Sequence, residues 1–179
     1  MPIRVVPYDT SWPAQFNLIH VALADALRHV PIIAIEHVGS TSVPGLPAKP
    51  VIDVDVVVRR EHLAPAIEAL VTAGYRHEGD LGIRDRHAMR APDRAPERNV
   101  YVAVEGSLAL RNHLAVRDVL RADAARRDEY GRLKLDLAQR HAEDMDAYVA
   151  AKTELLGAIL ARGGLTDEER EEIALANRA

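Results

Sequence analysis

Two aspartates inside an apolar run are the residues of this chain best suited to do chemistry. Asp53 and Asp55 lie in segment 51–58, which reads VIDVDVVV and predicts a β-strand because β-branched residues dominate it. Alternate side chains of a strand share a face, so we expect the two carboxylates side by side, with Cα atoms roughly 6.5–7 Å apart. Neighbouring carboxylates repel each other, and Mg²⁺, which prefers oxygen ligands, would hold them together. Two exposed aspartates on an edge strand are the structural alternative.

A glycine–serine pair about a dozen residues upstream supplies a complementary feature. Gly39 and Ser40 follow an apolar run that predicts a strand. Glycine lets the backbone approach a ligand closely, and consecutive N–H groups with nearby hydroxyls form an anion-binding concavity. An ordinary structural turn is the alternative. Lys49 lies just before the second strand, where its ammonium group either reaches a phosphate or stays in solvent. A phosphate cradle beside a metal-binding carboxylate pair is what nucleotide chemistry requires.

Three arginines follow in a stretch of alternating residues. Arg84, Arg86 and Arg90 would share one face of a strand, because their spacing is i, i+2 and i+6. Cations on one face repel unless they meet anions, and arginine pairs well with phosphate oxygens. We expect Arg86 and Arg90 to neutralise a triphosphate. A solvated basic face paired with Asp80 and Asp85 is the alternative.

The elements that must position these residues follow from periodicity. Apolar residues recur at helical spacing between residues 12 and 29 and predict a helix with one buried face. The remaining pattern predicts strands at 75–80, 83–91 and 99–105, and helices near 61–73, 108–122, 124–141, 144–162 and 166–177. The expected fold class is α/β (α+β), a small mixed β-sheet followed by a helical layer. We expect one domain over residues 1–162 and a charged helical tail over 163–179, which is either mobile or an oligomer contact.

Composition narrows the classes of function. The 179-residue chain has a net charge of −4, so nucleic acid and anionic membranes are not expected partners. It has no cysteine, which excludes disulfides, thiolate metal sites and cysteine nucleophiles. The first residues lack the apolar core of a signal peptide, and no apolar run approaches the length of a membrane span. We therefore expect a cytoplasmic protein.

The residues around the aspartates also resemble a known pattern. A glycine–serine turn followed by Asp-x-Asp is similar to the signature of the DNA polymerase beta-like nucleotidyltransferase superfamily. Within it, residues 36–54, which read EHVGSTSVPGLPAKPVIDV, closely resemble the GrpB family. The sequences VPYD at 6–9 and HLAVRD at 113–118 also resemble that family. The resemblance extends over residues 4–160 and implies the nucleotidyltransferase fold.

This resemblance implies a Mg²⁺-dependent transfer of a nucleoside monophosphate from a nucleoside triphosphate to the hydroxyl of a small-molecule or protein acceptor. Asp53 and Asp55 would be the catalytic and metal-binding residues. The residues that bind the nucleotide would be Gly39, Ser40, Lys49, Arg86 and Arg90.

Two departures from the family pattern bear on catalysis. Superfamily enzymes usually carry a third carboxylate on a later strand, and in the predicted strand 99–105 only Glu105, at its end, is acidic. Relatives usually read His-x-His where this chain has Asn99-Val100-Tyr101. A second hypothesis is therefore a non-catalytic nucleotide- or ligand-binding module that regulates a partner, in keeping with GrpB-like domains fused to dephospho-CoA kinases. A third is a DxD glycosyltransferase, for which the chain is short.

Other residues near the predicted site have structural interpretations beside functional ones. A lone histidine such as His37, next to the turn, is more typical of a structural residue than of a ligand. His113 and Arg117 lie one turn apart on a predicted helix, where they either line the cleft or tie the helical layer to the sheet. Lys134 and Lys152 also resemble family positions.

Overall fold

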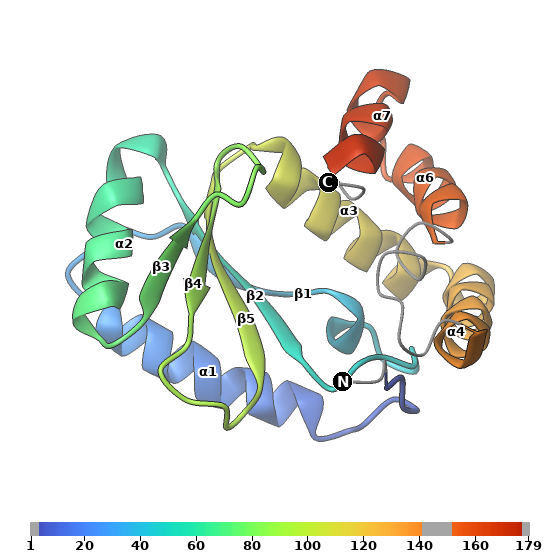
Figure 1. The fold of residues 1–179 in the computed structure, drawn as a ribbon, viewed down its shortest axis with the longest axis horizontal. Coiled ribbons are helices and arrows are strands. Elements are labelled where there is room, and N and C mark those ends of the chain that lie inside the picture. Colours follow the sequence, from blue (N-terminus) through green and yellow to red (C-terminus); the bar gives the residue numbers. More distant parts are fainter. Residues whose placement is uncertain (1–3, 141–151, 177–179) are drawn as a thin grey trace.

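The computed structural model describes residues 4–140 and 152–176 (Figure 1). Along the chain, the helices and strands of these residues are α1 (Trp12–Ala26), β1 (Ala34–Val38), β2 (Ile52–Val58), α2 (Leu63–Thr72), β3 (Arg76–Gly79), β4 (Arg86–Arg90), β5 (Arg98–Val104), α3 (Leu108–Ala122), α4 (Ala124–Arg140), α6 (Thr153–Arg162) and α7 (Asp167–Ala176). A short 3₁₀ turn, η1 (Ser40–Ser42), follows β1. The predicted order of a sheet followed by helices is confirmed. The predicted helix near 144–162 begins outside the described residues.

The five strands form one mixed sheet in the order β1-β2-β5-β4-β3. β2 and β5 are parallel, and the other neighbouring pairs are antiparallel. β2 therefore has a hydrogen-bonded strand on each side. The interpretation of its aspartates as residues of an edge strand is wrong.

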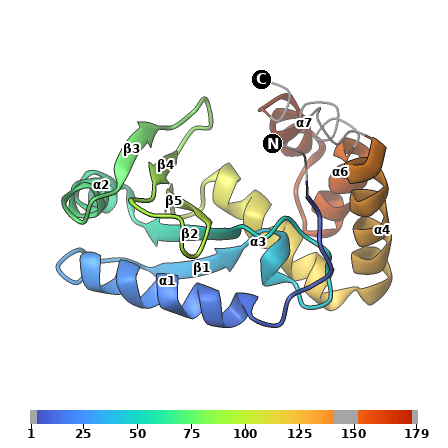
Figure 2. The same ribbon diagram turned by 60° about the horizontal axis from the view of Figure 1, so that its bottom comes forward.

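One face of the sheet forms the main core with α1 and α2. Figure 2 shows α1 running along this face, with α2 beside it. Strand residues that alternate with the aspartates, such as Val54 and Val56, pack there against Leu23 of α1 and Leu70 of α2, and all four are fully buried. Because alternate residues of a strand share a face, the burial of these valines directs the aspartates to the opposite face.

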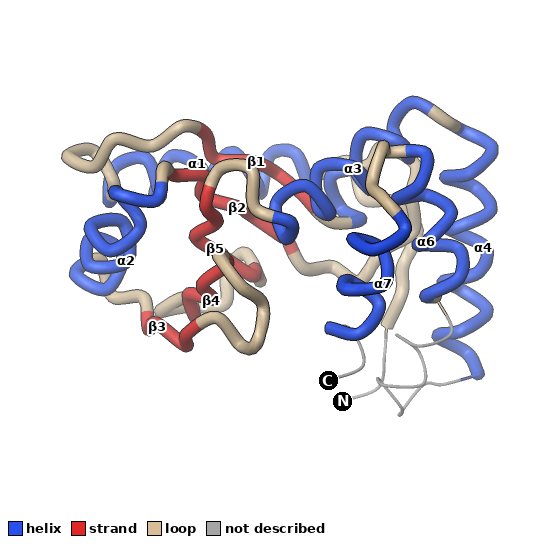
Figure 3. Tube along the Cα trace, turned by 90° about the horizontal axis from the view of Figure 1, so that it is seen from above, coloured by secondary structure: helices blue, strands red, loops and turns tan. Residues whose placement is uncertain are grey.

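The last third of the described chain is a helical layer at one end of the sheet. Figures 2 and 3 show α4, α6 and α7 grouped together, with α3 between them and the sheet. Leu120 of α3 and Ile159 of α6 share a core cluster with Leu46 of the loop before β2. Ile173 of α7 packs against Leu160 of α6. The C-terminal helix is thus part of the packed layer.

The structure shortens the predicted strand at 83–91. β4 begins at Arg86, because Leu81 and Asp85 have positive φ values of 51° and 63° and bend the preceding residues into turns. Arg84 lies in this turn, with 89% of its side chain exposed, and contacts Asp85 at 3.7 Å. The expectation that Arg84 shares a strand face with Arg86 is therefore wrong. Within residues 4–140 and 152–176, none of the helices is both long and apolar enough to cross a membrane.

Candidate functional site

The two predicted aspartates lie on the face of β2 that points away from α1 and α2. In the register with β5, Asp53 is opposite Asn99 and Asp55 is opposite Tyr101. The adjacent strand therefore presents an amide and a phenol to the aspartates. Glu105, the candidate for a third carboxylate, is exposed and follows the end of β5. The site contains two aspartates on neighbouring same-face positions, as the sequence predicts.

Asp55 is fully buried, and its two carboxylate oxygens have different surroundings. Oδ2 lies 2.8 Å from Nδ1 of His113, which comes from α3. Oδ1 is buried and has no hydrogen-bond partner among the described residues. Burial opposes a charge on His113, but the charge of Asp55 and its hydrogen bond outweigh burial and raise the pKa of the imidazole. A buried carboxylate oxygen without a protein partner is a position that a bound water or cation would satisfy.

Asp53 lies against the glycine–serine turn. Its Oδ1 accepts a hydrogen bond of 2.8 Å from Nδ2 of Asn99. Burial is the largest influence on the Asp53 carboxyl and raises its pKa, although the Asn99 hydrogen bond acts in the opposite direction. Gly39 has a φ of +69°, and a Cβ atom added to it would lie 2.1 Å from Oδ2 of Asp53. Glycine is thus required at this position both for its backbone conformation and for the close approach of the carboxylate.

The turn itself is held from two sides. Oγ of Ser42 donates to the carbonyl of Gly39 at 2.6 Å, and Arg121 of α3 donates from Nε and Nη2 to the carbonyl of Ser42 at 2.9 and 2.7 Å. On the other side, Nε2 of His37 lies 3.0 Å from Oγ1 of Thr41 in the turn, and the His37 ring stacks on Phe16 with 4.7 Å between the ring centres. Burial, followed by the charges of nearby arginines, lowers the pKa of His37 to about 4. His37 is a neutral structural residue, in agreement with its sequence interpretation.

Side chains one turn apart on α3 reach successive parts of the site. His113 contacts Asp55, and Arg117, one turn later, lies 2.6 Å from Glu36 of β1. Glu36 is opposite Asp55 in the register of β1 and β2, so Arg117 compensates a third carboxylate on the same face. Arg121, a further turn along, holds the glycine–serine turn. α3 thereby fixes the position of both strands and of the turn.

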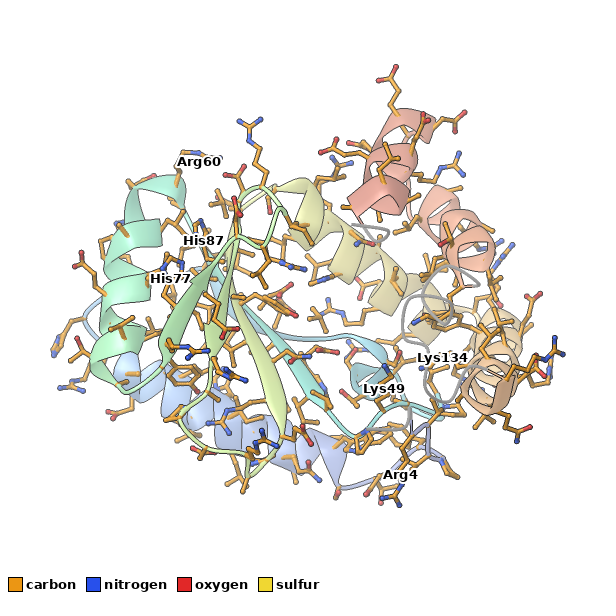
Figure 4. The ribbon with its side chains drawn as sticks, viewed as in Figure 1. Arg4, Lys49, Arg60, His77, His87 and Lys134 are labelled. Carbon is orange, nitrogen blue, oxygen red and sulfur yellow. The ribbon has the colours of Figure 1, made fainter. Side chains whose placement is uncertain are left out.

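All three lysines of the chain line one cavity beside Asp53. The cavity has a volume of about 200 Å³. It is lined by Ser40, Thr41, Lys49, Val51, Asp53, Asn99, Lys134 and Lys152. Figure 4 shows Lys49 and Lys134 directed toward the same space, from the loop before β2 and from α4. The residues predicted to bind the nucleotide on this side, Ser40 and Lys49, are therefore brought together with Asp53.

Burial lowers the pKa of all three lysines of the cavity, and neighbouring lysine charges lower it further for Lys134 and Lys152. Nζ of Lys134 donates to the carbonyl of Pro47 at 2.5 Å. Burial, followed by the charge of Lys152, lowers the pKa of Lys134 to about 7. Burial, followed by the charge of Lys49, lowers the pKa of Lys152 to about 8. Ammonium groups that repel one another around a cavity favour an anionic ligand between them. The sequence pattern alone does not place Lys134 and Lys152 in this site.

Arg86 and Arg90 of β4, the two arginines predicted to neutralise a triphosphate, lie in different environments. The guanidinium carbon of Arg86 lies 4.4 Å from the centre of the Tyr101 ring, and its buried Nε has no hydrogen-bond partner among the described residues. Arg90, at the other end of β4, is exposed and lies 3.6 Å from Glu78. Arg90 lines a separate cavity of about 330 Å³, which it shares with Asn99 and Tyr101. Neither arginine lines the cavity of the lysines.

The donor set around β2 fits a magnesium ion that keeps positions for a substrate. Across residues 4–140 and 152–176, no group of three or more His, Cys, Asp or Glu side chains could hold a metal ion by itself. Asp53 and Asp55 nevertheless offer carboxylate oxygens on one face, and Oδ1 of Asp55 is buried without a partner. Mg²⁺ is commonly bound by one or two carboxylates together with substrate phosphates and water.

Sequence comparisons identify relatives along most of the chain. Residues 2–162 match the family model described as GrpB protein. The UPF0157 protein SCO7215 of Streptomyces coelicolor is 34% identical over 171 residues, which cover 92% of this chain and 86% of that protein. A dephospho-CoA kinase of Mycolicibacterium paratuberculosis is 34% identical over an alignment of 179 residues, gaps included. The alignment covers 84% of this chain and 43% of the kinase. The matching region is therefore less than half of the kinase.

Solved structures agree with these matches. The crystal structure of the conserved protein GrpB from Enterococcus faecalis superposes with a TM-score of 0.77 at 30% identity and covers 95% of this chain and 99% of that chain. A mutant of the Cid1 poly(U) polymerase bound to MgATP superposes with a TM-score of 0.56 at 12% identity, over 83% of this chain and 50% of the polymerase. At that identity the likeness shows the fold alone. This chain therefore belongs to the GrpB family and has the nucleotidyltransferase fold.

Proposed function

We propose that this protein is a Mg²⁺-dependent nucleotidyltransferase that transfers a nucleoside monophosphate from a nucleoside triphosphate to a hydroxyl group of an acceptor. The observation that carries the proposal is the position of the lysine cavity at one end of the aspartate pair. Carboxylates for a metal and cations for phosphates lie side by side on one face of the sheet. The nucleotide substrate also supports the expected cytoplasmic location.

Asp53 and Asp55 would hold the Mg²⁺ ion. When bound, the ion would supply positive charge to the phosphate oxygens on which negative charge develops. The unpartnered Oδ1 of Asp55 and the Oδ2 of Asp53 are the oxygens that this role requires. His113 keeps the other oxygen of Asp55 in place, and Asn99 does the same for Asp53. These two hydrogen bonds fix the orientation of both carboxylates before any ligand binds.

The β- and γ-phosphates would lie in the lysine cavity. Ser40, which follows Gly39 in the turn, lines this cavity, and the three lysines supply the charge. A triphosphate would restore the charge of Lys134, whose pKa is about 7 in the ligand-free protein. The reaction forms a bond between the acceptor oxygen and the α-phosphorus, and it breaks the bond from that phosphorus to the bridging oxygen. Pyrophosphate leaves, and the hydroxyl proton passes to water.

A second candidate is a nucleotide-binding module without catalytic activity. The specific observation in its favour is that β5 presents Asn99 and Tyr101, rather than a carboxylate, to the aspartates. The match to part of a dephospho-CoA kinase supports an accessory role beside another enzyme. Pyrophosphate release distinguishes the two candidates, because a binding module is stabilised by the nucleotide but produces no pyrophosphate with any acceptor.

The proposal is tested by thermal unfolding with a panel of nucleotides, with and without Mg²⁺. A ligand that binds the folded state raises its stability by mass action, so the measurement requires no known acceptor. We expect a Mg²⁺-dependent rise in Tm for the wild-type protein and no such rise for the Asp53→Asn/Asp55→Asn double variant. If the double variant keeps the full rise, the assignment of the metal site is wrong.

A further inference from the structure

A second cavity lies on the side of the aspartate pair that is remote from the lysines. Its volume is about 690 Å³, which is within the range of roughly 300–1,000 Å³ found for small-molecule sites. It lies between the turn before β4, the first half of α3 and one face of α7. Its lining includes charged side chains (Arg84, Asp85, Arg86, Glu172), polar side chains (Asn112, His113) and apolar side chains (Ile83, Leu108, Ile173, Leu175). Asp85 is paired with Arg60 and Glu172 is exposed, so the half-buried Arg86 beside the apolar walls suits an amphipathic anion.

The register of the sheet places this cavity and the lysine cavity at opposite ends of the aspartate pair. Val57, the next same-face residue of β2 after Asp55, is opposite Ala103 of β5, and Ala103 is opposite Arg86 of β4. Successive same-face positions on a strand are roughly 6.5–7 Å apart. Arg86 therefore lies one position beyond Asp55, whereas the lysine cavity contacts Asp53.

In the described part of the chain, the guanidinium of Arg86 forms no ion pair with a carboxylate. Within residues 4–140 and 152–176, no carboxylate lies within ion-pair distance of its guanidinium. The adjacent Asp85 is occupied by Arg60, which donates two hydrogen bonds of 2.8 Å to its carboxylate. The guanidinium of Arg86 stacks on Tyr101 instead, and its buried Nε lacks a partner. A half-buried guanidinium at the edge of a cavity favours an anionic group there.

We infer that this cavity holds the acceptor, and that the acceptor carries a phosphate, sulfate or carboxylate group close to its hydroxyl and an apolar body. The inference rests on the proposed nucleotide transfer. In an in-line displacement, the attacking and leaving oxygens lie on opposite sides of the phosphorus. With pyrophosphate leaving toward the lysines, the acceptor oxygen approaches from the side of Arg86 and His113. The side chain of His113 is 23% exposed, so the acceptor can contact it.

α7 forms the wall that selects the apolar part of the acceptor. The match to the family ends at residue 162, so this helix lies beyond it. Arg111 of α3 donates two hydrogen bonds to Glu169, at 2.5 and 3.1 Å, and holds α7 over the cavity. Ile173 and Leu175 line the cavity from this helix, and Leu175 remains 60% exposed. A change at Leu175 alters the cavity without removing a core residue.

The test uses the full chain and a fluorescent probe with the inferred chemistry. 8-Anilinonaphthalene-1-sulfonate has an apolar body and one anionic group, and N-phenyl-1-naphthylamine is a neutral molecule of similar shape. We expect Arg86→Gln to weaken binding of the sulfonate about tenfold and to leave binding of the neutral probe unchanged. Leu175→Glu should weaken binding of both probes. Arg90→Gln is the matched control, because it removes the same charge from the same strand outside this cavity.

The outcomes separate this inference from the proposed function. If Arg86→Gln weakens binding of Mg²⁺ and ATP but leaves the sulfonate unaffected, Arg86 contacts the triphosphate and the inference is wrong. Displacement of the sulfonate by Mg²⁺ and ATP would also overturn it, because the probe would then occupy the nucleotide site. If nucleotides fail to bind while Arg86→Gln weakens sulfonate binding, the cavity is an anion site and the proposed transfer is wrong.

Discussion

His113 and Asp55 are joined by a contact of 2.8 Å between Nδ1 and Oδ2, and this contact connects the helical layer to the central strand of the site. The carboxylate of Asp55 has no exposed surface, whereas 23% of the histidine side chain is exposed. The imidazole therefore separates the carboxylate from the cavity beside α7. One oxygen of Asp55 is held by a helix, and the other has no hydrogen-bond partner among the described residues.

Gly39→Ala should abolish nucleotide binding. A Cβ atom at Gly39 would lie 2.1 Å from Oδ2 of Asp53, and the φ of +69° is unfavourable for alanine. We expect a loss of about 1–3 kcal/mol in the free energy of unfolding and no Mg²⁺-dependent rise in Tm with ATP. Gly45→Ala is the matched control, since its φ is +82° but its nearest contact is the flexible side chain of Arg127 at 3.5 Å. The control should lose stability and keep nucleotide binding, and equal binding by both variants would contradict the role of Gly39.

Asn99→Asp should make the ligand-free protein less stable. It should also make the Tm rise at a lower Mg²⁺ concentration. The amide of Asn99 now donates to Asp53 at 2.8 Å, and a carboxylate in its place would repel Asp53. We expect a loss of about 1–3 kcal/mol in chelator, measured by urea unfolding. A third carboxylate should also lower the Mg²⁺ concentration at which Tm begins to rise. Asn17→Asp, on the exposed face of α1, is the control and should change neither quantity.

Arg121→Lys should weaken nucleotide binding with little change in stability. Arg121 donates two hydrogen bonds to the carbonyl of Ser42, and the single ammonium group of lysine cannot reproduce this geometry. We expect the Kd for Mg²⁺ and ATP to rise about tenfold, a change of about 1.4 kcal/mol, by calorimetric titration. Arg132→Lys makes the same change at an exposed position of α4. An unchanged Kd in the Arg121 variant would mean that the turn does not depend on α3.

Lys134→Met should remove a pH dependence of stability above neutral pH. The pKa of Lys134 is about 7 in the folded protein and 10.5 for an unperturbed lysine. Between these values the unfolded chain binds a proton that the folded chain does not, so stability rises with pH from about 7 to 10.5. Below pH 7 both states are protonated, and the buried charge destabilises the folded state. The methionine variant should therefore be several degrees more stable than wild type at pH 6, and the difference should shrink toward pH 10.

These pH profiles require nucleotide-free protein in chelator and thermal unfolding at each pH. Addition of ATP and Mg²⁺ at pH 7 should raise the Tm of the wild-type protein more than that of the Lys134→Met variant, because the phosphates stabilise the charged lysine. Parallel profiles for the two proteins would contradict the assignment of the low pKa to Lys134.

The local pattern of the sequence predicts the arrangement of the two aspartates in the candidate site. β-Branched residues around Asp53 and Asp55 indicated a strand, and its period of two indicated that both carboxylates share a face. The glycine at position 39 indicated a close approach of the backbone, which the structure shows to be an approach to Asp53. These features depend on residues close together in the chain, where periodicity and backbone preference determine the geometry.

Contacts between distant segments could not be predicted in the same way. Lys134 reaches the site from α4, and its side chain passes next to Pro47, far away in the sequence. The pattern of a helix shows which side is apolar, but it does not show which loop the helix meets. The available signal was compositional, because only three of the 23 lysine and arginine residues are lysines. Alternation alone predicts a strand at Arg84, because it does not reveal the positive φ of Asp85.

The gathering of every lysine around one cavity also determines how this protein responds to reagents that attack amines. Lys134 and Lys152 have pKa values of about 7 and about 8, so at pH 8 a large fraction of each is the nucleophilic neutral amine. Arginines, which supply the other 20 of the 23 basic side chains, do not react with such reagents. Acylation of side-chain amines is therefore confined by composition to Lys49, Lys134 and Lys152. Protection of these three lysines by a nucleotide, measured by peptide mapping after acylation, would report occupancy of the cavity.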